Sequence, residues 1–78
     1  MAKDGRKMGP VIVVVAERTD IYMTARNAAA HGMAVERVLP DARVLNGYCD
    51  PAILESLRGI QGVETADEAR AHSSRALN

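Results

Sequence analysis

An uninterrupted run of apolar residues near the start of the chain limits what this sequence can fold into. Residues Val11 to Ala16 read Val-Ile-Val-Val-Val-Ala, with no polar residue between them. A β-branched run without alternation is typical of a strand that is covered on both faces or lies at the centre of a sheet. The run is also too short to be a membrane span or the apolar region of a signal peptide. We therefore expect a strand inside a sheet and no membrane association.

The next segment predicts an amphipathic helix. Thr19 or Asp20 can cap a helix that begins at Ile21 and ends near His31, where Gly32 follows as a terminator. The residues expected on one face of this helix are Tyr22, Ala25, Ala29 and Met33, and we interpret Met23 and Met33 as core residues. A face built largely of alanine lets a helix pack closely on a sheet.

The middle of the chain predicts a hairpin. Residues 35–39 and 43–49 each have the composition of a strand, and Pro40-Asp41-Ala42 between them is typical of a turn. We interpret the pair Asn46-Gly47, inside the second of these strands, as a backbone position that needs an unusual φ or a bulge. Its expected role is therefore in the fold.

A short helix and a weak strand complete the pattern. Asp50-Pro51 supplies an N-cap and a first-turn proline for a helix that ends near Gly59, with an apolar face of Ile53, Leu54 and Leu57. Residues 63–69 alternate weakly and include Glu64, Asp67 and Glu68. Acidic residues in a strand favour a position at the edge of a sheet.

The element order β-α-β-β-α-β predicts an α+β protein with a ferredoxin-like sandwich. In that fold a four-stranded antiparallel sheet carries two helices on one face, and the first and third strands are central. We expect residues 1–9 to form a flexible leader, residues 10–70 the single domain and residues 71–78 a flexible tail. The second sheet face lacks a helical cover, and we expect it to be mostly polar or to engage a partner.

Composition excludes several classes of function. Ten basic residues balance ten acidic ones, so no overall charge attracts the chain to nucleic acid or to anionic lipid. Tyr22 and Tyr48 are the only aromatic residues, which leaves almost no platform for stacking on bases. The single Cys49 cannot form an internal disulfide, as a secreted domain of this size usually would. We therefore expect a cytoplasmic protein that recognises its partners by shape.

The residues also lack a catalytic pattern. Neither His31 nor His72 has a partner at metal-ligand spacing, and Cys49 has no nearby base in the sequence. We interpret His31 as a helix C-terminal residue and Cys49 as a small buried residue at a strand end. Lys3 and Lys7 are the only lysines, and both lie in the leader. We expect no enzyme, no cofactor and no metal.

The second half of the chain resembles the peptidase inhibitor I9 family, the propeptides of subtilisin-like serine proteases and their stand-alone inhibitor relatives. The matching motifs are Val44-Leu45-Asn46-Gly47-Tyr48, then the leucines Leu54 and Leu57, then Gly62-Val63-Glu64-Thr65-Ala66-Asp67-Glu68. The element order matches over residues 10–70 and the motifs over 43–68, with Tyr48 in place of the usual Phe. The chain also resembles small bacterial proteins labelled as ketohydroxyglutarate aldolases, but it has no lysine in the domain for that chemistry.

The resemblance implies a trans inhibitor or folding helper of a subtilisin-like serine protease. In this family the sheet packs against two helices of the protease, carboxylates at the last strand's end cap those helices, and the tail lies extended in the substrate cleft. Carried over to this chain, the protease-binding residues are Asp67, Glu68, His72, Ser73, Ser74, Arg75, Ala76, Leu77 and Asn78.

Two alternatives remain open from the residues alone. Asp67 and Glu68 are also explained as charges that protect an edge strand from pairing. The chain is also explained as a non-catalytic interaction or small-ligand regulatory module that acts as a homodimer through its sheet face or an edge strand.

Overall fold

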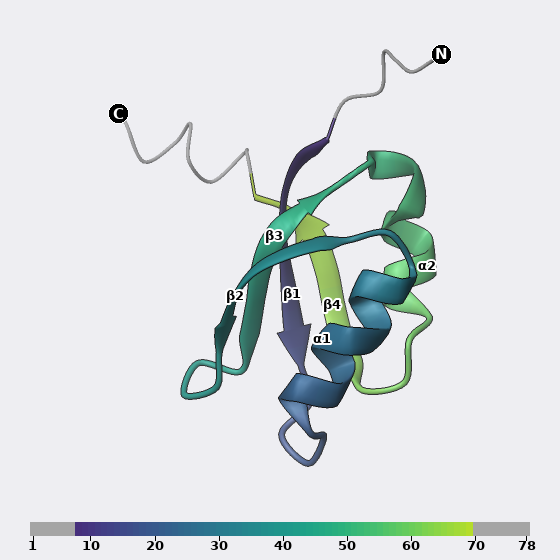
Figure 1. Cartoon of the computed structure of the whole chain (residues 1–78). Coiled ribbons are helices and arrows are strands. Elements are labelled where there is room, and N and C mark those ends of the chain that lie inside the picture. The colour runs from purple at the N-terminus through teal and green to yellow at the C-terminus, as the bar shows by residue number, and fades with distance from the viewer. Residues whose placement is uncertain (1–7, 70–78) are drawn as a thin grey trace.

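The fold is a four-stranded antiparallel sheet with two α-helices. A computed structural model describes residues 8–69. The elements in chain order, shown in Figure 1, are β1 (Gly9–Val15), α1 (Ile21–Ala30), β2 (Ala34–Leu39), β3 (Val44–Cys49), the 3-10 helix η2 (Pro51–Ile53), α2 (Leu54–Arg58) and β4 (Val63–Glu68). The predicted α+β class is confirmed. The first strand begins at Gly9, inside the segment predicted as a leader, because Gly9 pairs with Cys49.

The strand order is β2-β3-β1-β4, so β1 and β3 are central and β2 and β4 are the edges. β1 pairs antiparallel with both β3 and β4. The predicted edge position of the acidic strand, β4, is therefore confirmed. β2 pairs antiparallel with β3.

The core lies on one face of this sheet only. Along β1, Val11, Val13 and Val15 are at most 2% exposed, whereas the residues between them are only partly buried. Side chains from both helical segments and from β3 and β4 complete the core: Ile21, Ala28, Met33, Leu45, Cys49, Leu57, Ile60 and Ala66. The apolar run is thus central but covered by helices on one face, and its outward side chains lie on the opposite face.

The structure corrects the predicted buried face of α1. Asp20 caps the helix, accepting hydrogen bonds from the backbone N–H groups of residues 22 and 23, and His31 is its C-cap. The buried residues are Ile21, Thr24 and Ala28, while Tyr22 is 59% and Met23 is 53% exposed. The sequence pattern missed Thr24 because it is polar. Its hydroxyl donates to the Asp20 carbonyl, at 3.1 Å, and this bond offsets the cost of burying it.

The pair Asn46-Gly47 has a role in the fold for a different reason from the one predicted. Gly47 is not among the glycines with positive φ, and the irregularity lies in the facing strand, between Val35 and Arg37 of β2. A Cβ atom at Gly47 would lie 2.1 Å from the carbonyl oxygen of Ala34. Gly47 is therefore required by the close approach of the β2 backbone.

Candidate protein-binding face

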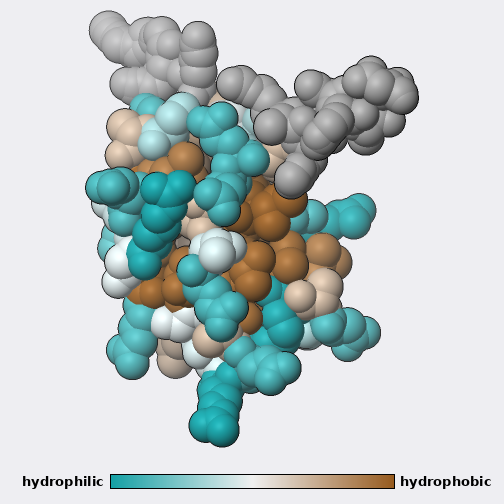
Figure 2. Space-filling model, turned by 180° about the vertical axis from the view of Figure 1, so that it is seen from behind, coloured by the Kyte–Doolittle hydropathy of each residue, from teal (hydrophilic) through white to brown (hydrophobic). Residues whose placement is uncertain are grey.

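The sheet has one face that no helix of the described residues covers, which we call the open face. Strand register and the alternation of burial place these side chains on it: Pro10, Ile12, Val14, Ala34, Arg37, Leu39, Val44, Asn46, Tyr48, Thr65 and Asp67. Figure 2 shows the molecule from this side, with apolar side chains gathered in the middle and hydrophilic ones around them.

The centre of the open face is an apolar patch formed by Ile12, Val14, Leu39 and Val44. Val44 lies opposite Val14 on one side and opposite Leu39 on the other, and all four side chains are partly exposed. The sequence predicted that this face is mostly polar or engages a partner, and its centre is apolar. Covering such a patch stabilises a complex by roughly 25 cal/mol for each Å² removed from water.

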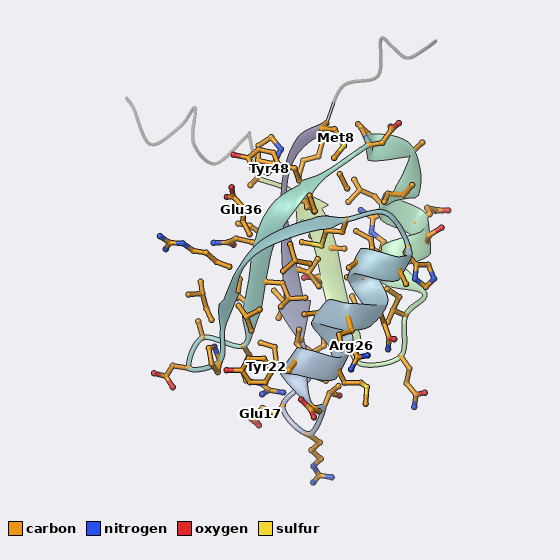
Figure 3. The ribbon with its side chains drawn as sticks, in the orientation of Figure 1. Met8, Glu17, Tyr22, Arg26, Glu36 and Tyr48 are labelled. Carbon is orange, nitrogen blue, oxygen red and sulfur yellow. The ribbon has the colours of Figure 1, made fainter. Side chains whose placement is uncertain are left out.

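A hollow of about 240 Å³ adjoins this patch, toward the start of β1. Its lining includes Ile12, Glu36, Asn46, Tyr48 and Ala69. Figure 3 shows Tyr48 and Met8 at the same end of the sheet, and they are 40% and 50% exposed. An exposed tyrosine suits a protein interface, because its ring offers apolar area and its hydroxyl group can make a hydrogen bond.

The predicted acidic residues lie at the end of β4. Arg58, from α2, places its Nη2 atom 3.3 Å from Asp67 Oδ1, and its Nε atom donates to the carbonyl oxygen of Ala66 at 3.0 Å. The Arg58 and Asp67 side chains are 46% and 67% exposed, and an exposed ion pair contributes only about 0–1 kcal/mol. Glu68 is exposed as well. The Asp67 carboxylate thus stays accessible to a partner while it contacts Arg58 of α2.

The predicted tail residues His72, Ser73, Ser74, Arg75, Ala76, Leu77 and Asn78 lie outside the described residues. Ala69, the last described residue, donates a hydrogen bond from its N–H group to the carbonyl oxygen of Pro10, at 2.9 Å. Ala69 also lines the hollow on the open face.

A smaller pocket, of about 210 Å³, lies at the end of the sandwich. It is lined by Gly9, Pro10, Val11, Cys49, Pro51, Leu54 and Glu68. Cys49 is 2% exposed at the end of β3, which confirms its predicted place as a buried residue at a strand end. Burial raises the pKa of the Cys49 thiol, and the charges of Asp50 and Glu68 raise it further. The thiol is therefore protonated near neutral pH and a poor nucleophile.

We predict that Cys49 in the folded protein reacts with a disulfide reagent at pH 8 more than about 100-fold slower than in denaturant, because it must wait for local opening. Because its pKa is raised on folding, its contribution to stability is present below the unfolded-state pKa and is lost as the pH rises through the folded-state value. Cys49→Ala should remove that part of the alkaline loss, measured by urea unfolding at several pH values. A reaction rate equal in native and denatured protein would contradict this prediction.

No group of three or more His, Cys, Asp or Glu side chains within residues 8–69 is placed to hold a metal ion. The Nδ1 atom of His31 lies 2.8 Å from the carbonyl oxygen of Asn27, as expected for a histidine that ends a helix. No helix in the described part of the chain is long and apolar enough to cross a membrane.

Comparisons with known protein families, with curated proteins and with solved structures found no match to this chain. The open face, its apolar patch and the adjoining acidic edge therefore carry the functional argument. Sequence reasoning missed two parts of this site. The alternation of exposure along β1 leaves no signal in an all-apolar run, and the contact of Arg58 with β4 depends on where α2 packs.

Proposed function

We propose that this chain is a non-catalytic binding domain of the I9 propeptide type, which binds a subtilisin-like serine protease in trans. The element order, with β1 and β3 at the centre of the antiparallel sheet, supports a ferredoxin-like sandwich, the fold that the resemblance implies. The function that follows is inhibition of the protease or assistance in its folding.

The observation that carries this proposal is the open face. It combines an apolar patch, an exposed tyrosine and the end of β4, where Ala69 lines the adjoining hollow. A face of this kind can pack against helices of a protease while the following segment reaches the substrate cleft. Backbone hydrogen bonds of an extended segment supply affinity, and its alternate side chains supply specificity.

Asp67 and Glu68 fit the same mode of binding. Both are exposed at the end of β4: Asp67 lies opposite Ile12 on the open face, and Glu68 lies opposite Val11 at the mouth of the pocket beside Cys49. Carboxylates at such a position can accept hydrogen bonds from the unpaired N–H groups at the N-terminus of a partner's helix, where the helix dipole also favours negative charge.

A small-ligand function is less well supported by the cavities. The pocket beside Cys49 has a volume of about 210 Å³, whereas ligand sites usually have about 300–1,000 Å³. The broad apolar patch on the open face favours a macromolecular partner instead.

The test is the residual activity of a subtilisin mixed with a micromolar excess of the purified chain. We expect the full chain to slow the protease, and a chain without residues 71–78 to lose inhibition. Ile12→Glu, in the centre of the open face, should also weaken inhibition by at least tenfold, because it buries a charge in the complex.

The matched control is Met23→Glu, which places the same charge on the exposed surface of α1. Thermal unfolding establishes that each variant is folded, and Tyr48→Arg replaces Ile12→Glu if the latter is not. Failure of the full chain to slow the protease, or equal inhibition by the truncated chain, would reject the proposal.

A further inference from the structure

The two edge strands of the sheet differ in whether a side chain covers their outer backbone groups. At β4, Arg58 reaches round from α2, donates to the Ala66 carbonyl and pairs with Asp67, so a guanidinium group blocks that edge. At β2, no side chain among residues 8–69 hydrogen-bonds to the backbone of the strand. The edge that is open to another strand is therefore β2.

The irregularity in β2 changes which way its side chains point. Val35 and Val38 pack against the core, while Ala34 and Leu39 lie opposite residues of the open face, Tyr48 and Val44. Between them, two consecutive residues share the open face: Arg37 lies opposite Asn46, and Glu36 lines the hollow beside Asn46 and Tyr48. Along β2 the side chains thus point to the open face, the core, the open face twice, the core and the open face again.

This pattern of faces reads the same in both directions, and the residues at corresponding positions are either both apolar or of opposite charge. If two copies of β2 pair antiparallel about their midpoint, Glu36 of each copy lies opposite Arg37 of the other. Val35 then lies opposite Val38, and Ala34 opposite Leu39, with each pair on one side of the sheet. Cross-strand pairs of opposite charge and of apolar residues both stabilise antiparallel strands.

The irregularity is what makes this pairing possible. In a regular strand a two-fold axis sets a residue opposite its own copy, because side chains alternate between the faces. Two Glu36 or two Arg37 side chains would then face each other and repel. With both charges on one face, the same axis sets opposite charges together. Edge strands are often protected by charges that repel a second strand, and this edge carries a self-complementary pair instead.

We propose that a second copy of this chain adds to the β2 edge about a two-fold axis perpendicular to the sheet, so that the two sheets become one. Glu36, which is labelled beside β2 in Figure 3, and its neighbour Arg37 form the central contacts. The open faces of both copies remain accessible, so the inference does not depend on the proposed protease. One strand pair buries less than the roughly 1,200 Å² of a standard interface, so the dimer should dissociate on dilution.

The test is sedimentation velocity of the full chain over a range of concentrations. Glu36→Arg and Arg37→Glu should each weaken dimerisation by about tenfold, because both contacts change from attraction to repulsion. The double variant, with the two charges exchanged, should dimerise like the original chain. An equimolar mixture of the two single variants should form a heterodimer, since one presents two cations and the other two anions.

The control is Arg26→Glu, the same charge reversal on the exposed surface of α1, which should leave the dimer unchanged. A chain that stays monomeric at every concentration would overturn the inference. So would single variants that dimerise as well as the original chain, or a dimer that survives the charge reversals but is lost in Ile12→Glu, because such a dimer would use the open face.

Discussion

Replacing Gly47 with alanine is expected to destabilise the domain by about 3 kcal/mol or more, at or above the upper end of the range for overpacked sites. The new Cβ would lie 2.1 Å from the carbonyl oxygen of Ala34 and 3.0 Å from Met33 Cε. A methionine side chain can move aside, but the carbonyl belongs to the backbone of β2. The strand must shift, and the loss is a large part of the roughly 5–15 kcal/mol that stabilises a typical domain.

Gly9→Ala is the matched control for this variant. Both glycines lie in strands of the same sheet, and a Cβ at Gly9 would meet nothing within 4 Å. Urea unfolding followed by circular dichroism should give a midpoint near the original for Gly9→Ala and a much lower one for Gly47→Ala. Equal midpoints would show that β2 does not approach β3 this closely.

Replacing Leu45 with alanine is expected to cost about 2–5 kcal/mol, the range for truncating a buried leucine. Leu45 is completely buried and lies on β3, opposite Val13 of β1 and Val38 of β2. The rigid sheet backbone on both sides prevents the site from collapsing, so a cavity remains and its lining loses contacts. The free energy of unfolding, again from urea unfolding, measures the loss.

Val44→Ala tests whether the two faces of β3 differ as the structure indicates. Val44 is the neighbour of Leu45 but points to the open face and is partly exposed. Its truncation should cost no more than about 1 kcal/mol. A loss equal to that of Leu45→Ala would mean that the open face is covered in the folded monomer, which would also contradict its proposed role in binding.

The residues of β3 alternate between the core face and the open face of the sheet. Leu45, Gly47 and Cys49 point to the core, whereas Asn46 and Tyr48 point to the open face. The motif on which the proposed I9-type function rests is therefore partly required by the fold. Asn46 and Tyr48 are its members that a partner can touch.

The strands and turns were predictable because their signals are local. The β-branched run of β1, the capping residues Asp20 and Asp50, and the terminator Gly32 all act within a few residues of their position in the chain. The helix face was not predictable in the same way, since burial of Thr24 and exposure of Met23 depend on how α1 is turned against the sheet.

The amino-acid sequence by itself determined the element order, the helix ends, the edge position of the acidic strand and the burial of Cys49. These follow from backbone propensity, capping and polarity, which each residue carries wherever it lies. Only the tertiary structure decided which alternate residues of the apolar β1 run are exposed and why position 47 must be glycine. It also decided that Arg58 covers the β4 edge and that Glu36 and Arg37 lie on one face of the sheet. Those features depend on contacts between segments distant in the chain, where packing rather than local preference sets the free energy.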